Sequence, residues 1–193
     1  MDVINLIGII IAYLIGSIPS GFVIARMHNI RDIREHGSGN IGATNVARVL
    51  GLKYFFIVLF LDFSKAYLCI RSLQFYDFDV MYQLLAGIAL LLGNSYPIFL
   101  QFRGGKGVAT VCGILLALNP YLILYSLFIW LAVAITTKTI GKASIAAFCC
   151  APFISAYILR DSYWMFIAVC LISLFGLLRH RTNMMLYYQQ AWR

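Results

Sequence analysis

Seven apolar segments follow one another along this chain, joined by short polar connections. They are Val3–Ala25, Tyr54–Ile70, Val80–Phe102, Val108–Leu118, Pro120–Thr136, Ala143–Leu159 and Tyr163–Leu178. A helix needs about 20 mostly apolar residues to cross a bilayer. Hydrophobic residues make up 62% of the chain and charged residues 11%, whereas a soluble domain carries about 25% charge. We therefore exclude a soluble globular domain and a disordered chain. The sequence predicts an all-α integral membrane protein of seven transmembrane helices, with residues 1–193 forming one polytopic domain.

The distribution of charge predicts how this protein sits in the membrane. The fourth segment, Val108–Leu118, has eleven residues, which reach only about half of a bilayer at roughly 1.5 Å per residue. If it crosses as a short helix, one side receives twelve cations against two carboxylates, and the other receives two cations against four carboxylates. If it turns back, most of this asymmetry is lost. The positive-inside rule favours seven crossings, with the N-terminus outside and the C-terminus in the cytoplasm.

The connection after the first segment carries a glycine-rich run that suits an anion. It comprises Gly37, Ser38, Gly39, Asn40, Ile41, Gly42, Ala43, Thr44 and Asn45, and Arg48 follows shortly after. Glycines let backbone N–H groups approach an anion closely, and the arginine fork fits a phosphate. The alternative is a flexible polar connector. The glycine spacing imitates a dinucleotide fingerprint, but no strand precedes it, so we reject that interpretation.

A second glycine-rich run, Arg103-Gly104-Gly105-Lys106-Gly107, leads directly into the fourth segment. Free N–H groups and the dipole at a helix N-terminus favour an anion there. The run is not a Walker A loop, since that pattern needs glycine at Leu100 and Ser or Thr at Gly107. A nucleotide is therefore not expected. The alternative is a surface turn whose lysine meets lipid headgroups.

Two further polar clusters lie on the same predicted side of the membrane. Ser144 opens the predicted sixth helix, where its alternative role is that of an N-terminal capping residue. His180 and Asn183 follow the seventh segment at a spacing that would place them on one helical face. The alternative for His180 is an interaction with the C-terminal dipole of that helix.

One carboxylate and one lysine, Asp62 and Lys65, lie inside the second segment. A charge in mid-membrane costs roughly 2.5–3.5 kcal/mol on insertion scales, so their i,i+3 spacing predicts a mutual ion pair. The first interpretation is a structural pair that holds helices together, and the alternative is a proton or ion pathway.

The inventory of reactive groups points to anion binding without a metal or cofactor. The five cysteines all lie in apolar runs and are interpreted as small hydrophobes. The only carboxylates on the basic side are Asp32 and Glu35, so no pair is placed for acid–base work. We expect a site that holds phosphate groups beside a lipid-like tail, with no metal, no cofactor and no nucleic-acid partner.

These residues together resemble the bacterial acyl-phosphate-dependent glycerol-3-phosphate acyltransferases, the PlsY family. The matching motifs run from the first segment to the last: Gly16-Ser17-Ile18-Pro19 with Gly21, Gly37 through Asn45 with Arg48, Leu61-Asp62 with Lys65, Tyr96-Pro97, Gly104 through Thr110, Ala143-Ser144-Ile145, and Arg179-His180-Arg181 with Asn183. The resemblance implies seven membrane helices and a cytoplasmic active site in the bacterial inner membrane.

The resemblance implies transfer of a fatty acyl group from acyl phosphate to the 1-hydroxyl of glycerol 3-phosphate, giving lysophosphatidate and phosphate for phospholipid synthesis. The implied catalytic residues are Ser38, Arg48, Lys106, Ser144, His180 and Asn183. The implied substrate-binding residues are Gly37, Gly39, Asn40, Gly42, Thr44, Asn45, Gly104, Gly105 and Gly107. The family is thought to use the donor's phosphate, and no protein base, to take the proton. The soluble enzyme that makes acyl phosphate is an implied partner.

The sequence departs from the family at two positions and leaves two rival functions open. Many relatives carry His at Asn94 and Ser at Gly141, so neither residue is included in the catalytic set. Acyl-CoA-dependent glycerolipid acyltransferases use His-x4-Asp, which none of the three histidines satisfies. The rivals are a transporter of a phosphorylated metabolite and a structural membrane subunit. No internal repeat of the transporter kind is seen.

Overall fold

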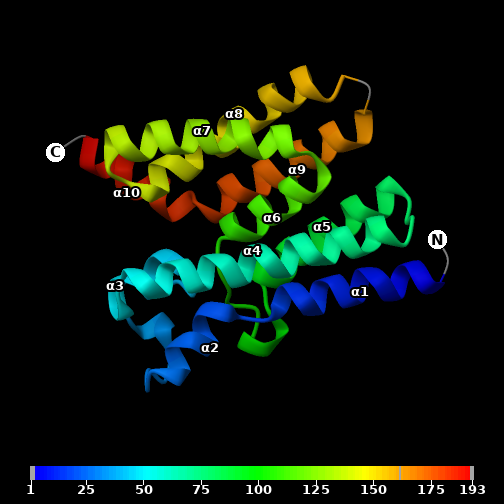
Figure 1. Cartoon of the computed structure of the whole chain (residues 1–193). Coiled ribbons are helices and arrows are strands. Elements are labelled where there is room, and N and C mark those ends of the chain that lie inside the picture. The colour runs from blue at the N-terminus through cyan, green and yellow to red at the C-terminus, as the bar shows by residue number, and fades with distance from the viewer. Residues whose placement is uncertain (1–2, 161, 192–193) are drawn as a thin grey trace. The chain divides into compact units, whose positions relative to one another are not determined.

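The computed structural model describes residues 3–160 and 162–191, and in these ranges every regular element is helical. Asp2, Asp161 and Arg193, which contribute to the predicted charge asymmetry, lie outside the described residues. The chain packs as two compact units, Met1–Leu118 and Asn119–Arg193, which are described in turn (Figure 1).

The first unit is built around three long helices that lie side by side (Figure 1). Its elements are α1 (Val3–Ser17), α2 (Ser20–Met27), the 3₁₀ turn η1 (Ile33–Glu35), α3 (Ala43–Leu50), α4 (Leu52–Phe75), α5 (Val80–Ser95), the 3₁₀ turn η2 (Ile98–Leu100) and α6 (Val108–Leu118). Helix α1 packs along α5, and α4 packs along α6. Small residues permit these close approaches, since a Cβ on Gly16 would collide with the backbone of Leu90.

The first predicted segment is one continuous helix only as far as Ser17. Pro19 has no N–H to continue the ladder, and Ser20 N donates to Ile18 O at 3.1 Å instead of to the carbonyl of Gly16, four residues back. The prediction of a single helix over Val3–Ala25 is therefore wrong in this detail. The break frees backbone carbonyls inside the apolar region, and their partners are described below.

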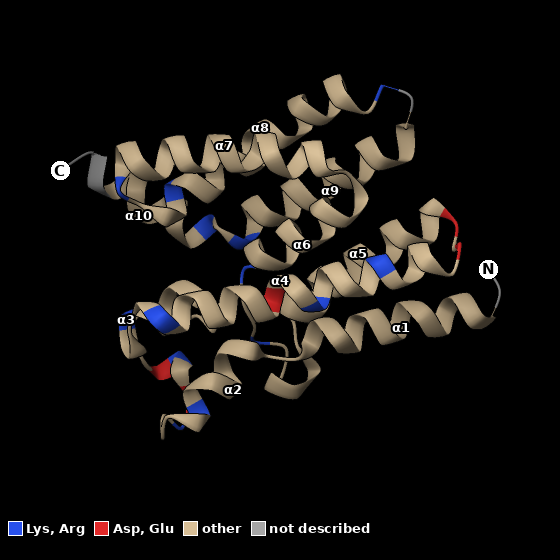
Figure 2. Ribbon diagram, viewed as in Figure 1, with Lys and Arg blue, Asp and Glu red and all other residues tan. Residues whose placement is uncertain are grey.

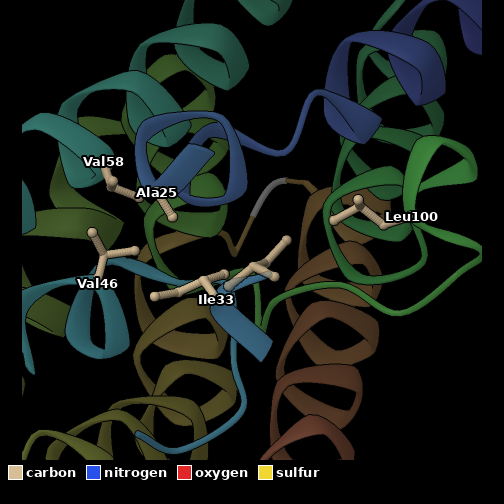
Figure 3. Packing of buried hydrophobic residues seen from close by; sticks show 6 residues of the cluster. Ala25, Ile33, Val46, Val58 and Leu100 are labelled. Carbon is tan, nitrogen blue, oxygen red and sulfur yellow. The ribbon is translucent and has the colours of Figure 1, made fainter. Parts of the chain in front are cut away.

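A buried cluster lies at the end of this unit where α2, α3 and both 3₁₀ turns meet (Figure 3). It contains Ala25, Ile33, Ile41, Val46, Val58 and Leu100, each at most 7% exposed. The cluster joins residues from α2, η1, α3, α4 and η2 with Ile41, which lies in the first glycine-rich run. Burial of a valine, leucine or isoleucine side chain stabilises a fold by about 1.5–3 kcal/mol. The cluster therefore anchors the first glycine-rich run to the helices through Ile41.

Charged residues of the first unit gather mainly toward its two ends, and α4 carries a few between them. Figure 2 shows charged positions around α2 and α3, none along α1, and an acidic turn at the opposite end, where α4 joins α5. That turn contains Asp77 and Asp79. The separation is consistent with a basic and an acidic side at the two ends of α4.

The second unit is a helical hairpin extended by a third and a fourth helix. It contains α7 (Pro120–Thr137), α8 (Ile140–Ile158), α9 (Tyr163–Arg179) and α10 (Arg181–Ala191). Helix α8 packs against both α7 and α9. Asn119 accepts a hydrogen bond from Tyr121 N at 3.0 Å and caps α7, and Pro120 occupies its first position, where the missing N–H costs nothing.

Four of the described helical stretches are long and apolar enough to cross a membrane: Val3–Met27, Val80–Leu100, Pro120–Thr137 and Ile140–Ile158. The pair Tyr163–Arg179 and Arg181–Gln189, bent by 53°, brings the number to five if it counts as one span. Helix α6 is shorter, and α4 is long but carries Asp62 and Lys65. The chain is thus an all-helical integral membrane protein. Five of the seven predicted segments coincide with one helix each, whereas the first is divided between α1 and α2 and the third between α5 and η2.

Candidate functional site

The first glycine loop (Gly37–Asn45) takes its shape from one helical side chain. Asn45 is 1% exposed. Its amide oxygen accepts from Ser38 N at 2.6 Å, and its amide nitrogen donates to the carbonyls of Ile33, His36 and Asn40 at 3.3, 2.9 and 2.8 Å. These four contacts of the Asn45 amide all go to the backbone of the loop or of the turn that precedes it, so Asn45 organises the loop from within.

Positive φ angles explain two of the glycines in this loop. Gly37 has φ +61° and Gly39 has φ +70°, a region that side chains disfavour. A Cβ at Gly37 would also collide with the amide oxygen of Asn45. These residues are glycine because the turn demands it, and the resulting bend leaves Ser38 exposed.

The loop ends at the N-terminus of α3. Asn40 Oδ1 accepts from Gly42 N at 2.8 Å, which orders the last residues before the helix begins at Ala43. Thr44 lies in the first helical turn and is half-buried, and Arg48 is exposed one turn further on. Because the first N–H groups of a helix lack intrahelical partners, this end favours an anion near Thr44.

The second glycine loop (Arg103–Gly107) is fastened to the end of α5. Gly104 N donates to Ser95 O at 3.1 Å, and Gly105 N donates to Asn94 O at 3.0 Å. A Cβ at Gly104 would lie 2.8 Å from Ser95 O, so this contact requires glycine. Gly107 has φ +77° and delivers the chain into α6. Lys106 is half-buried between two buried glycines.

The two glycine loops meet at Gly105. A Cβ added there would lie 3.7 Å from Ile41 Cγ1 and 3.8 Å from Asn40 Oδ1. Two helix N-termini, of α3 and α6, follow the two loops directly. The structure thus brings Gly37, Ser38, Gly39, Asn40, Gly42, Thr44, Asn45, Gly104, Gly105, Lys106 and Gly107 into one region of the first unit.

An ion pair braces this region from the side. Arg34 donates to both carboxylate oxygens of Asp32, with a shortest N–O distance of 2.6 Å, and also to Leu100 O at 3.2 Å. The hydrogen bonds from Arg34 lower the pKa of Asp32, and the same bonds raise the pKa of Arg34. The pair connects the turn before the first glycine loop to the turn before the second.

The predicted ion pair between Asp62 and Lys65 is confirmed at 2.8 Å. Ser20 Oγ also donates to Asp62 Oδ1 at 2.8 Å. Lys65 Nζ donates to Gly16 O at 3.1 Å and to Ile18 O at 2.8 Å, the carbonyls at the helix break. It further donates to Asn94 Oδ1 at 3.1 Å. A buried charge pair with this many hydrogen bonds is well compensated.

In the second unit Ser144 lies one turn inside α8, which begins at Ile140. The interpretation of Ser144 as the residue that opens this helix is therefore wrong, because the helix starts directly after Thr139. Ser144 is 2% exposed. Its hydroxyl donates to Ile140 O at 3.0 Å and accepts from Trp130 Nε1 at 3.2 Å, which fixes its orientation.

His180 sits at the corner between α9 and α10. It is 2% exposed, and its Nδ1 lies 2.8 Å from Gly176 O. A carbonyl only accepts, so Nδ1 carries the hydrogen and Nε2 is the nitrogen turned away from α9. The ring lies 5.7 Å from that of Phe148, one turn after Ser144 on α8. His180 and Asn183 do not share one straight helix, because α9 ends at Arg179 and α10 begins at Arg181.

Asn183 packs against the first turn of α8. A Cβ at Gly141 would lie 2.5 Å from Asn183 Nδ2 and would also collide with the hydroxyl of Tyr187. Lys142 Nζ lies 5.2 Å from the centre of the Tyr187 ring. Gly141 thus makes room for Asn183. The second unit places Asn183 against the first turn of α8, Ser144 in the next turn and His180 beside Phe148, one turn further on.

Sequence reasoning missed two residues that matter for this geometry. Asn94 contacts both Lys65 and the second glycine loop, and Gly141 admits Asn183. The signal for both was their departure from the pattern of the family. Among the described residues no group of three or more His, Cys, Asp or Glu is placed to hold a metal ion.

The fold and these loops define the class: a helical integral membrane protein in which two glycine loops meet ahead of two helix N-termini. The model of the family Glycerol-3-phosphate acyltransferase matches residues 6–189. The chain belongs to the PlsY family of glycerol-3-phosphate acyltransferases, as the sequence motifs predict.

Relatives and solved structures agree with this assignment. A glycerol-3-phosphate acyltransferase of Staphylococcus haemolyticus is 40% identical over 184 residues, with 91% of this chain and 90% of that protein covered. One of Aquifex aeolicus is 39% identical over 179 residues, with 91% of each covered. The crystal structure of PlsY in its glycerol 3-phosphate form superposes with a TM-score of 0.90 at 36% identity, covering 96% of this chain and 92% of that one.

Proposed function

We propose that this enzyme transfers a fatty acyl group from acyl phosphate to the 1-hydroxyl of sn-glycerol 3-phosphate. The observation that carries the proposal is the junction at Gly105, where two glycine loops meet ahead of two helix N-termini. Each loop suits one phosphate group, and the reaction brings two phosphates together, one on each substrate. The solved PlsY structures hold glycerol 3-phosphate and lysophosphatidic acid respectively, which are substrate and product of this reaction.

The proposed chemistry needs little from the protein beyond position and charge. The 1-hydroxyl oxygen attacks the acyl carbon, a C–O ester bond forms, and the bond from the acyl carbon to the phosphate oxygen breaks. The hydroxyl proton passes to the departing phosphate. The products are lysophosphatidate and inorganic phosphate. Cations and backbone N–H groups would stabilise the charge that develops on the carbonyl and phosphate oxygens.

The proposed roles follow from where each side chain lies within its own unit. In the first unit Ser38, Arg48 and Lys106 would meet the phosphate groups, together with the backbone of Gly37, Gly39, Gly42, Gly104, Gly105 and Gly107 and the side chains of Asn40 and Thr44. Asn45 would act by shaping the loop, because its amide is used by the loop backbone. In the second unit Ser144, His180 and Asn183 would orient glycerol 3-phosphate or the acyl group.

We further propose the topology predicted from the sequence. It has seven crossings, with the N-terminus outside and both glycine loops on the cytoplasmic face of a bacterial inner membrane. Helix α4 is counted as a crossing because Asp62 and Lys65 neutralise each other, which lowers the cost of burying them. The bilayer would hold the acyl chain, and the soluble enzyme that makes acyl phosphate would supply the donor.

The competing function is transport of a phosphorylated metabolite. The buried Asp62–Lys65 pair is the observation that favours it, since charged residues inside a membrane often mark an ion pathway. Here Lys65 is bonded to the carbonyls of Gly16 and Ile18, which fits a structural brace better than a mobile proton relay.

An assay of the purified protein tests the proposal. Palmitoyl phosphate and glycerol 3-phosphate are supplied in detergent or in liposomes, and released phosphate and lysophosphatidate are measured together. We expect equal amounts of both products, and little turnover when palmitoyl-CoA replaces palmitoyl phosphate. Equal rates with the two donors would refute the choice of donor. Uptake of glycerol 3-phosphate into liposomes without acylation would support the transporter instead.

A further inference from the structure

The buried pair Asp62–Lys65 touches elements that lead to both glycine loops. Asp62 is 8% exposed, and its carboxylate accepts from Ser20, the first residue of α2. The next residue, Gly21, packs on the first glycine loop so closely that a Cβ would collide with Ile41 O. Asp62 therefore holds the start of α2 where it supports the first loop.

On the other side, the pair reaches the second glycine loop through Asn94. Lys65 has only donors, so the Asn94 atom at 3.1 Å must be the amide oxygen. The amide nitrogen then faces the loop, since a Cβ at Gly105 would lie 3.2 Å from Asn94 Nδ2. The backbone carbonyl of Asn94 accepts from Gly105 N at 3.0 Å. Lys65 thus fixes which way the Asn94 amide points beside Gly105.

The same lysine also holds the break in the first membrane segment. It donates to Gly16 O and Ile18 O at 3.1 and 2.8 Å, and Gly16 O lacks its regular helical partner because Ser20 N donates to Ile18 O instead. Lys65 can act on the two glycine loops without touching a predicted substrate-binding residue. Its effect on the loops runs through Asn94 on one side and through Ser20 by way of Asp62 on the other.

We propose that Asp62, Lys65 and Asn94 are positioning residues that set the two glycine loops at their mutual distance, so that both phosphate groups are bound in register. This role rests on the proposed function, because it assigns the pair to the same phosphate site. A purely structural pair would change stability alone. A positioning pair changes the affinity for phosphate ligands in protein that remains folded.

The test uses full-length protein in detergent and five variants. Lys65→Met and Asp62→Asn each remove one charge, and Asp62→Asn with Lys65→Met removes both, which is often tolerated when a buried pair is replaced as a unit. Asn94→Asp keeps the oxygen for Lys65 and loses the N–H at Gly105. Lys53→Met is the matched control, a lysine on the same helix that is exposed.

Three quantities are measured for each variant: the dissociation constants of glycerol 3-phosphate and of inorganic phosphate by calorimetry, KM and kcat for acylation, and the unfolding midpoint. We expect Asn94→Asp and the double variant to raise the dissociation constants and KM about tenfold or more, as loss of a hydrogen bond to a charged group allows. Asn94→Asp should remain folded, its kcat should fall less than threefold, and Lys53→Met should match the unaltered protein.

The outcomes separate the positioning role from the proposed reaction. If the unaltered protein binds phosphate but does not acylate glycerol 3-phosphate, the proposed reaction fails and the binding data still judge the positioning role. Unchanged dissociation constants in folded Asn94→Asp and in the double variant overturn the positioning role. An equal weakening in Lys53→Met overturns it as well, since the effect would then follow from any lost charge on α4.

Discussion

The backbone N–H of Ser38 donates to the side-chain oxygen of Asn45 across seven residues at 2.6 Å. A loop residue with a predicted role in catalysis is thus held by a helical residue of α3. The amide nitrogen of Asn45 also donates to the carbonyl of Asn40 in the loop and to those of Ile33 and His36 just before it, and Asn45 is 1% exposed. The first glycine loop is therefore a fixed structure whose shape depends on one buried side chain.

We predict that Asn45→Asp destabilises the protein and impairs acylation together. The carboxylate keeps an acceptor for Ser38 N but loses the two N–H donors that three carbonyls share, at about 1 kcal/mol each, or about 2 kcal/mol in all. The measurements are the free energy of unfolding and kcat/KM, which we expect to fall at least tenfold. The control is Asn29→Asp at an exposed position. An Asn45→Asp protein as stable and active as the original would show that the loop holds its shape by other means.

Two lysines on the predicted cytoplasmic side should differ sharply in importance. Lys106 lies between buried glycines at the start of α6, whereas Lys138 is exposed at the end of α7. We expect Lys106→Ala to lower kcat/KM about 100-fold or more, the usual cost of losing a preorganised charge in an active site. Lys138→Ala should change it less than threefold. Activities in membranes at matched expression decide, and equal activities would mean that Lys106 is only a surface charge.

Gly141→Ala should separate activity from stability. The added Cβ would meet Asn183 Nδ2 at 2.5 Å and push that side chain off α8, while alanine favours the helix by about 0.5–1 kcal/mol over glycine. We expect kcat/KM to fall about tenfold with an unchanged or higher unfolding midpoint. Gly8→Ala is the control, since a Cβ at Gly8 meets no atom within 4 Å. Full activity of Gly141→Ala would show that the position of Asn183 is not critical.

The Asp32–Arg34 pair predicts a dependence of stability on pH. The hydrogen bonds from Arg34 lower the pKa of folded Asp32 below its ordinary value of 3.8. A carboxylate with a depressed folded pKa stabilises the protein above its unfolded pKa, and the contribution is lost as the pH falls through the folded pKa. We expect Asp32→Asn to lower stability at pH 7 by about 0.2–1 kcal/mol, as for a partly exposed pair.

Thermal unfolding of both proteins between pH 7 and pH 3 measures this difference, with Asp77→Asn at an exposed position as the control. The gap between Asp32→Asn and the original protein should narrow toward pH 3. Asp32 Oδ1 also accepts a hydrogen bond from Arg34 N at 2.9 Å and so caps the 3₁₀ turn. If the stability difference between the two proteins is constant over this range, the loss of stability comes from the lost cap and not from the lost charge.

Local signals in the sequence were enough to predict where most of the helices lie and to predict one ion pair. The bounds of α6, Val108–Leu118, are as predicted, because Gly107 and Asn119 with Pro120 mark both ends. The i,i+3 spacing of Asp62 and Lys65 was enough to predict their contact. In each case the deciding residues lie within one or two turns of each other.

Long-range contacts are what the sequence could not supply. Lys65 meets Gly16 across 49 residues and Asn94 across 29, and no spacing rule relates positions so far apart. The helix break at Pro19 was missed because the hydropathy of the segment continues through it. The sequence could not show whether Asn45 binds substrate or holds the loop backbone in shape. Both roles require a polar side chain after the glycines, so the residue type does not distinguish them.

The last prediction concerns His180, whose geometry allows either of two roles. Its Nδ1 donates to Gly176 O at 2.8 Å, so the neutral ring presents Nε2 as an acceptor. An oriented imidazole is what a general base requires. A residue that only holds a hydroxyl or a phosphate in place requires an oriented imidazole just as much. The orienting group is a carbonyl and not a carboxylate, and it stabilises an imidazolium less than an ionised partner would.

We therefore predict that His180 positions glycerol 3-phosphate and that the donor's phosphate takes the proton. His180→Gln still donates and accepts hydrogen bonds but cannot act as a base at neutral pH. Its KM for glycerol 3-phosphate should rise about tenfold, in line with one altered hydrogen bond, and kcat should stay within about tenfold of the original. The measurement is steady-state kinetics at saturating palmitoyl phosphate, with His28→Gln as the control, a histidine paired with Tyr54 on the first unit. If kcat falls about 10⁴-fold, the upper end for a lost general base, while KM is unchanged, His180 is the base.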